Sequence, residues 1–364
     1  MFLEPFFPNN AGYEYRSNKW KEYLDKADFD VEIKNVLNEH EFYRLTSKND
    51  LLNFHLLFIF RRFKQVLWSF GKFDIIIVRR ALLLFNDYGD LFLDRLLLKF
   101  QDNVILDYDD DLSSNISGNE KRSIFGKILI ENRLIFYQAL KIYPRFMAGS
   151  EYLKNIAQNI RPNLNEKDIL VLPTCVDYLK YPPKSYSSIG KKITLGWIGS
   201  DGNQKYLDLI VNQLNALSEK FNIELLVISG KEYSNDMAKF NILNLIWSLD
   251  SEIESLYQVD IGIMPLPDNK TARAKCGFKV IQYMGLGIIS VATSITTNAE
   301  IIDHDINGFL VQKDNDWESA LENVINKWSL FPSISQKARE KISSAYSFEA
   351  HNQKLQLFLN SQSV

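Results

Sequence analysis

Short apolar runs alternate with longer helical patterns along most of this 364-residue chain. Apolar runs of roughly four to eight residues are typical of strands buried on both faces, and the helical patterns supply the crossovers that parallel strands require. Strands are expected at 1–7, 29–33, 73–78, 103–108, 145–149 and 169–173, and again at 193–199, 223–230, 244–247, 259–266, 287–293 and 308–311. The alternation predicts an α/β protein with doubly wound, Rossmann-like parallel sheets.

The chain length and one polar segment indicate two domains. A length of 364 residues exceeds one ordinary core, since domains average about 150 residues. Residues 173–192 are rich in proline, serine and lysine and show no sustained period, so we interpret them as a linker. We expect one domain over 1–175, a second over 176–345 and a final helix over 346–364. Two such domains facing each other would bind ligands at the carboxyl ends of their strands.

Composition excludes several classes of protein. A net charge of −3 argues against nucleic acid as the main partner. Cys175 and Cys276 cannot form a disulfide framework, and no secretory pattern follows Met1, so a reducing cytoplasm is expected. The histidines are far apart in sequence, and no structural zinc is expected. Neither a G-x-G-x-x-G nor a G-x-x-x-x-G-K-[ST] motif occurs, which disfavours dehydrogenases and P-loop enzymes.

Residues 51–70 are the most apolar helical segment. No charge-free window is long enough to span a membrane, because Arg61, Arg62 and Lys64 interrupt the segment. We interpret it as a core helix with an exposed basic end. The alternative is a helix that lies on a membrane surface with a basic flank.

Glycines and a lysine follow the first strand of the second domain. Gly199, Ser200 and Gly202 would allow a ligand close to the backbone, and Lys205 opens the next helix. A plain strand-to-helix turn is the alternative.

Cations also crowd the start of an apolar helix in the same domain. Arg273, Lys275 and Lys279 surround Gly277, and Gln282 lies on the same helical face as Lys279. The pattern fits either an amphipathic helix with a basic edge or an anion site, where helix-start N–H groups and cations bind phosphate.

A polar turn precedes the next short helix. Thr296, Thr297 and Asn298 would either cap this helix or donate to a phosphate, and Glu300 fits a capping charge in its first turn.

In the first domain, acidic residues end one strand and a glycine-bearing turn follows another. Asp107, Asp109, Asp110 and Asp111 could bind a metal, hold an acceptor hydroxyl, act as a base or cap the next segment. The turn near the first strand contributes Gly12, Tyr13 and Arg16.

Taken together and in their order along the chain, these motifs resemble those of the retaining glycosyltransferases of family 4 (glycosyl transferases group 1), which have the two-domain GT-B fold. The resemblance is strongest over residues 193–311, through "DIGIMPLP", "KCGFKVIQYMGLG" and "NAEIIDHDINGFLV". It implies that the second domain binds a nucleotide-diphosphate sugar, that the first binds the acceptor, and that the last helix crosses back to the first domain.

The resemblance also implies roles for individual residues. Lys205 and Lys279 match the family's phosphate-binding lysines, and with Arg273 or Lys275 they would neutralise the leaving group without a metal. The implied donor-binding residues are Gly199, Ser200, Gly202, Gly277, Gln282, Thr297, Asn298 and Glu300. Acceptor-side residues are Gly12, Tyr13, Arg16, Asp107, Asp109 and Asp110.

The sequence departs from the family pattern at three positions. Ser200 replaces an arginine of the first loop, and Ala274 and Gln282 replace a pair of glutamates. Gln282 can still donate and accept hydrogen bonds at a ribose, without a charge.

The implied activity is transfer of a sugar, with retention, to a glycan or lipid-linked acceptor in surface polysaccharide or glycoconjugate synthesis. No cofactor is implied. We expect a cytoplasmic protein, with peripheral association at the inner face of the membrane as one option. The alternative is a catalytically lapsed subunit that binds sugar nucleotides.

Overall fold

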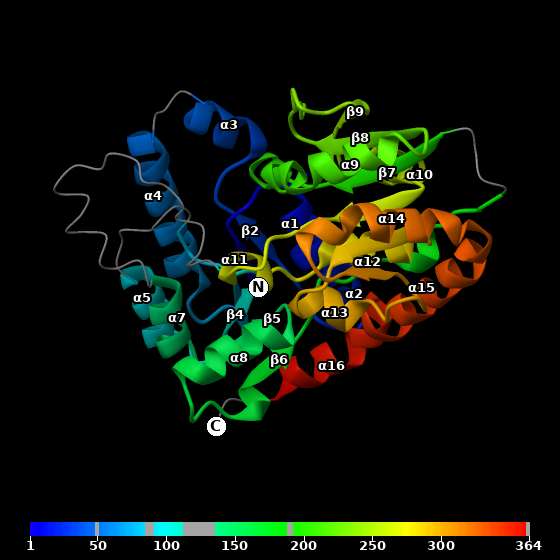
Figure 1. Ribbon diagram of the computed structural model, residues 1–364. Coiled ribbons are helices and arrows are strands. Elements are labelled where there is room, and N and C mark those ends of the chain that lie inside the picture. The colour runs from blue at the N-terminus through cyan, green and yellow to red at the C-terminus, as the bar shows by residue number, and fades with distance from the viewer. Residues whose placement is uncertain (48–50, 84–90, 112–134, 188–191, 362–364) are drawn as a thin grey trace. The chain divides into compact units, whose positions relative to one another are not determined.

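The computed structural model describes residues 1–47, 51–83, 91–111, 135–187 and 192–361 (Figure 1). The chain divides into two compact units, Met1–Thr174 with His351–Val364 (unit 1) and Cys175–Ala350 (unit 2). Within the described residues, each unit contains one six-stranded sheet, and all the paired strands run parallel. The predicted α/β class is confirmed.

The sheet of unit 1 has the strand order β2-β1-β3-β4-β5-β6. Its strands are β1 Phe2–Glu4, β2 Ile33–Asn35, β3 Ile76–Arg79, β4 Val104–Tyr108, β5 Arg145–Ala148 and β6 Ile169–Val171. The order reverses between β1 and β3. In a doubly wound sheet, ligands bind outside the carboxyl ends of the strands at such a switch point.

The helices of unit 1 begin directly after β1. They are α1 Ala11–Tyr13, the π-helix η1 Glu14–Asn18, α2 Lys19–Asp25, α3 Glu39–Ser47, α4 Leu51–Ser69, α5 Phe92–Phe100, α7 Ile135–Ile142 and α8 Glu151–Ile160. The helical patterns of the sequence also predict helices over 88–100 and 120–143, and the parts at 88–90 and 120–134 lie outside the described residues. Residues 188–191 of the predicted linker do so as well.

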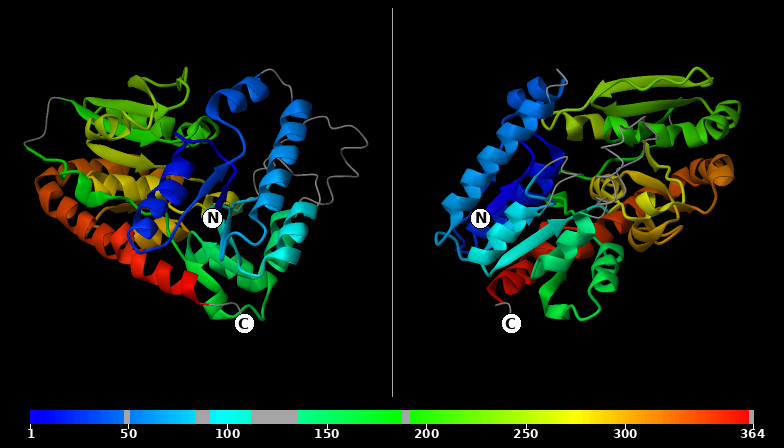
Figure 2. Two further views of the ribbon diagram at one scale, coloured as in Figure 1. Left: turned by 180° about the vertical axis from the view of Figure 1, so that it is seen from behind. Right: turned by 90° about the vertical axis from the view of Figure 1, so that its left-hand side faces the viewer.

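The apolar segment 51–70 forms helix α4, which runs along one side of unit 1 (Figure 2). The prediction of an exposed basic end was wrong for Arg62, which is fully buried. Its guanidinium donates to the backbone oxygens of Leu82 and Glu4 at 3.0 and 2.8 Å. Burial lowers the pKa of Arg62 to about 9.

The sheet of unit 2 has the order β12-β11-β10-β7-β8-β9. Its strands are β7 Ile193–Ile198, β8 Ile223–Ser229, β9 Asn241–Ile246, β10 Ile261–Met264, β11 Ile289–Thr293 and β12 Phe309–Val311. Counted from β7, this is the 3-2-1-4-5-6 order of dinucleotide-binding folds, and the switch point lies between β7 and β10.

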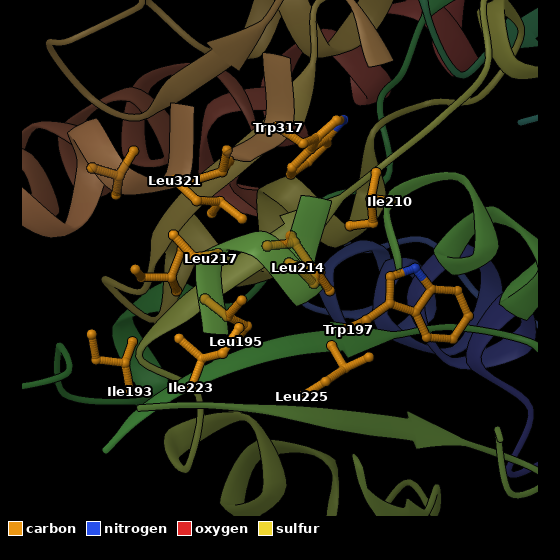
Figure 3. Close-up of a cluster of buried hydrophobic side chains, with 14 of the residues drawn as sticks. Ile193, Leu195, Trp197, Ile210, Leu214, Leu217, Ile223, Leu225, Trp317 and Leu321 are labelled. Atoms are coloured by element: carbon orange, nitrogen blue, oxygen red, sulfur yellow. The ribbon is translucent and has the colours of Figure 1, made fainter. Parts of the chain in front are cut away.

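Helices cover both faces of this sheet. They are α9 Val211–Ser218, α10 Glu252–Tyr257, α11 Lys270–Arg273, α12 Phe278–Gly285, α13 Thr296–Ile301, α14 Trp317–Asn326 and α15 Phe331–Ala345. Along the chain, the last helix, α16 Phe348–Asn360, begins in unit 2 and continues in unit 1. Leu214 of α9 and Trp317 of α14 pack with Trp197 of β7 on one face (Figure 3). Leu256 of α10 and Tyr283 of α12 pack with Ile198 on the other.

The last residues of the chain pack within unit 1. Arg145, which opens β5, donates to the backbone oxygen of Phe358 and to Ser361 Oγ. Its guanidinium also lies 4.2 Å from the ring centre of Phe358. This buried arginine therefore ties the end of α16 to the sheet.

Candidate anion site at the switch point of unit 2

The side chain of Lys279 lies against Gly199, the residue that follows β7. A Cβ at Gly199 would stand 2.7 Å from Lys279 Cε and 2.9 Å from its Nζ, so only glycine leaves room for this lysine. The ammonium also lies 4.9 Å from the ring centre of Trp197. A cation from the start of α12 therefore stands at the carboxyl end of the strand that borders the switch point.

Tyr283 fixes the helix that carries this lysine. It lies four residues after Lys279, hence on the same helical face. Its buried hydroxyl accepts from the Ile198 N–H at 3.1 Å and donates to the Gly196 oxygen at 3.2 Å. The ring packs so tightly on β10 that a Cβ at Gly262 would lie 2.4 Å from it. Helix α12 is thus docked on both strands of the switch point.

The start of α13 lies beside the start of α12. Gly277 precedes α12 with a positive φ of 66°, and a Cβ there would lie 3.3 Å from Asn298 Oδ1. Thr296 Oγ1 donates to the Arg273 oxygen at 2.7 Å, and Asn298 Nδ2 donates to the Thr293 oxygen at 3.1 Å. Thr297 Oγ1 is buried and has no hydrogen-bond partner among the described residues. An orphaned hydroxyl beside two helix starts suits an anionic ligand.

The other predicted cations point to different neighbours. Lys205 lies in the 3₁₀ helix η5 Asp201–Ile210, is exposed, and has its Nζ 5.6 Å from the Tyr206 ring centre. The Arg273 guanidinium donates to both carboxylate oxygens of exposed Asp268, at 2.6 and 2.9 Å. Lys275 is half-buried between α11 and α12. The structure therefore brings Lys279 to the strand end and holds Arg273 on an acidic partner.

The remaining loop residues are polar and accessible. Ser200 Oγ accepts from Asn203 Nδ2 at 2.8 Å. Gly202 is exposed, and the position where a Cβ would stand is open space. Glu300 is exposed on α13. Their donor-binding roles stay predictions.

Gln282 is buried and hydrogen-bonded to Glu252, a carboxylate that the sequence patterns did not indicate as a site residue. Its Nε2 donates to Glu252 Oε1 at 2.9 Å, and Trp247 Nε1 donates to Glu252 Oε2 at 2.6 Å. Glu252 is itself buried, at the start of α10. The sequence signal that could have identified Glu252 is a carboxylate at the start of a helix that follows a strand. Glu252 thus restores a negative charge next to the glutamine.

Replacing Glu252 with alanine should lower the free energy of unfolding by about 1–3 kcal/mol. The reason is that Nε1 of half-buried Trp247 and Nε2 of buried Gln282 would both lose their acceptor. Urea denaturation measures the change. Exposed Glu254 on the same helix is the control, and Glu254→Ala should stay within about 0.5 kcal/mol of the parent. Equal stability of the two variants would contradict a structural role for Glu252.

Arg16, Asp107 and Asp109, three of the predicted acceptor-side residues, form a largely buried cluster of ion pairs with arginines beside the switch point of unit 1. Arg16 of η1 donates to both carboxylate oxygens of Asp107 and, at 2.5 Å, to the Leu172 oxygen. Arg79 at the end of β3 lies 3.4 Å from Asp107 and 2.7 Å from Asp109, and Arg80 lies 2.8 Å from Asp109. Within the part of the chain that the structure describes, buried Arg79 Nη1 has no hydrogen-bond partner.

These contacts determine the protonation of the cluster. Burial would raise the pKa of Asp109, but Arg79, Arg80 and Arg16 hold that pKa well below its usual range. Asp109 is therefore a poor base. Because its pKa is lower in the folded state, the pairing stabilises the protein above the ordinary carboxyl pKa, and this stabilisation is lost as the pH falls into the acidic range.

The other predicted acceptor-side residues, Gly12, Tyr13 and Asp110, have separate neighbours. The Gly12 N–H donates to Asn10 Oδ1 at 2.9 Å in the first turn of α1. Burial, Glu4 and Glu14 raise the pKa of half-buried Tyr13. Asp110 Oδ1 accepts from the Asp111 N–H at 3.0 Å, as expected for a turn. Their acceptor-side roles stay predictions.

The described residues contain neither a metal-binding group of side chains nor a membrane-spanning helix. Within the described residues, no three acidic, histidine or cysteine side chains group in a way that could hold a metal ion. Among those residues, no helix has both the length and the apolar character needed to cross a bilayer.

Solved structures with the same fold cover the whole chain. A glycosyltransferase from Rickettsia africae ESF-5 shares 15% identity and a TM-score of 0.68 over 98% of this chain and 97% of its own. HepE from Anabaena, in complex with UDP-glucose, shares 12% identity and a TM-score of 0.65 over 98% of each chain. WaaG, described as involved in lipopolysaccharide biosynthesis, shares 12% identity and a TM-score of 0.62 over 99% of each. The expected GT-B fold is therefore confirmed.

The sequence comparison points to the same class. The family model of glycosyl transferases group 1 matches residues 192–327, which include the anion site. No curated protein matches the sequence significantly. TarM shares 14% identity and a TM-score of 0.61, but the chain spans only 58% of TarM's length. The resemblance to glycosyl transferases group 1 is confirmed.

Proposed function

We propose that the protein transfers a sugar from a nucleotide-diphosphate sugar to a hydroxyl group of a glycan or a lipid-linked acceptor. The observation that carries the proposal is the position of Lys279 at Gly199, beside the starts of α12 and α13. A cation, helix-start N–H groups and an orphaned threonine hydroxyl together suit a diphosphate. HepE, which has the same fold, was solved with UDP-glucose and with UDP.

In this proposal the residues of unit 2 stabilise the leaving group. Cleavage of the sugar–phosphate bond builds negative charge on the departing nucleoside diphosphate. The Lys279 ammonium and the N–H groups at the start of α12 neutralise that charge, and Thr297 Oγ1 donates to a phosphate oxygen. Lys205 is a second phosphate ligand, and Gln282, held by Glu252, hydrogen-bonds the ribose.

The finer features of the reaction are also proposals. Fixed cations replace a metal, and the acceptor hydroxyl attacks on the face from which the diphosphate leaves, so the sugar keeps its configuration. We propose that unit 1 binds the acceptor and that the reaction serves surface polysaccharide or glycoconjugate synthesis in the cytoplasm, with peripheral association at the membrane.

A screen of nucleotide sugars by thermal shift tests donor binding. A donor at 100 times its Kd should stabilise the protein by about 2.7 kcal/mol, because it binds only the folded state. The panel contains UDP, GDP, dTDP and ADP sugars, and the free nucleosides are the matched control, since they lack the diphosphate. The donor that binds is then incubated with lipid-linked and free glycan acceptors, and release of nucleoside diphosphate is measured.

Two outcomes would oppose the proposal. If nucleosides stabilised the protein as much as the sugar nucleotides, the diphosphate would not be the recognised group. If a donor bound saturably without transfer or hydrolysis across a broad acceptor panel, a lapsed, sugar-nucleotide-binding subunit would be favoured. The replacement of two family glutamates by Ala274 and Gln282 motivates that second candidate.

A further inference from the structure

Helix α4 of unit 1 is apolar on two opposite faces. Its inner face carries the fully buried side chains of Phe54, Phe58 and Val66. Its outer face carries Leu56, Phe60, Phe63 and Leu67, which are 58%, 55%, 37% and 44% exposed. Their spacing of four, three and four residues places these side chains on one side of the helix. A helix that only covers a sheet needs one apolar face, so the outer face is unexplained by the fold.

Further exposed apolar residues lie near the end of the helix. Trp68 is 40% exposed and Phe100, the last residue of α5, is 55% exposed. The rings of Phe70 and Phe100 lie 4.8 Å apart, so the ends of α4 and α5 are adjacent. Scattered apolar residues are ordinary on a protein surface, whereas four exposed apolar side chains on one helical face favour an interaction site.

Lysines border the same surface. Lys64 Nζ lies 4.3 Å from the ring centre of Phe60, and Lys72 and Lys34 lie 4.2 and 4.5 Å from that of Trp68. The sequence 51–69 contains no aspartate or glutamate. Arg61 is paired with Glu41 and Lys34 with Glu32, each at 2.7 Å, so these two add little to the charge, and Lys64 and Lys72 supply most of it. The rim of the patch is therefore cationic.

We propose that the outer face of α4 binds the surface of an anionic lipid bilayer, with the helix lying in the interfacial plane. Aromatic and leucine side chains enter the headgroup boundary, while lysines beside them reach the lipid phosphates. A second copy of this chain is a poorer occupant, because two such faces would bring like-charged lysines together. The proposal goes beyond the donor reaction and does not depend on it.

Cosedimentation of the full chain with vesicles tests the proposal. The vesicles contain phosphatidylcholine with about 30% phosphatidylglycerol, or phosphatidylcholine alone. The parent should bind the anionic vesicles more tightly. The double variant Phe60→Ser with Leu67→Ser should bind them about tenfold more weakly, since two exposed apolar groups are lost. The double variant Lys64→Glu with Lys72→Glu should lose the preference for anionic lipid.

Controls separate this surface from folding and from the donor site. Met237 and Leu330 are 63% and 50% exposed in unit 2, and replacing both with serine should leave vesicle binding unchanged. The α4 variant should keep the parent's thermal unfolding and its binding of nucleotide sugars. Vesicle binding by the α4 variant equal to that of the parent would overturn the proposal. A dimer in sedimentation that only the α4 variant dissociates would also overturn it, in favour of a second copy.

Discussion

Replacing Lys279 with alanine should lower kcat for sugar transfer by about 10²–10³-fold. Lys279 Nζ is the cation that the fold places at the end of β7, and the leaving diphosphate gains its charge in the transition state. Release of nucleoside diphosphate at saturating donor measures the rate. Lys279→Arg should recover part of it, because the charge remains although its length and shape differ.

The matched control is Lys337→Ala, which removes a half-exposed lysine of α15 whose partner is Glu340. This variant should turn over at the parent's rate, since surface pairs contribute little and the residue is outside the anion site. A Lys279→Ala enzyme within threefold of the parent would show that this lysine does not stabilise the leaving group.

Replacing Asp107 with alanine should lower the free energy of unfolding by about 3–5 kcal/mol. The change removes a buried negative charge that pairs with two buried guanidinium groups, Arg16 and Arg79. Among the described residues, Arg16 would keep the Leu172 oxygen as its hydrogen-bond acceptor. Chemical denaturation measures the loss. The large expected effect separates a structural carboxylate from one that serves only to hold an acceptor.

Asp102 provides the comparison for this experiment. It is exposed just before β4, whereas Asp107 lies within that strand. Asp102→Ala should change the unfolding free energy by less than about 0.5 kcal/mol. If Asp107→Ala were equally mild, the ion pairs would not hold η1 on the sheet, and an acceptor-side role for Asp107 would become the better interpretation.

The strands were predictable because parallel strands are buried on both faces and so appear as short apolar runs. The twelve expected runs each contain or adjoin an observed strand, and the largest difference is β2, found at Ile33–Asn35 and expected at 29–33. Helix α15 was missed, since only a few apolar residues, among them Ile334, Ala338 and Ile342, mark its buried face. The helix predicted to begin at Lys205 starts as a 3₁₀ helix and becomes the α-helix α9 only at Val211, a distinction that periodicity does not resolve.

The candidate site was less predictable than the fold, because its contacts join residues far apart in sequence. The cations near Gly277 were visible as a local cluster, but only the structure brings Lys279 to Gly199 and Arg273 to Asp268. The acidic strand end at Asp107 was identified without its partners, since Arg16 lies 91 residues away. Sequence patterns indicate which groups are available, and tertiary packing decides which of them neutralise one another.

The central claim is that unit 2 binds a diphosphate through Lys279. Calorimetric titration tests it most directly, with the nucleoside diphosphate that stabilises the protein best and with both the parent and the Lys279→Ala variant. The parent should bind saturably, and the variant should bind at least about tenfold more weakly. This corresponds to a loss of about 1.4 kcal/mol of binding free energy, as expected for a charge-assisted contact. Equal affinity of the two proteins would contradict the claim.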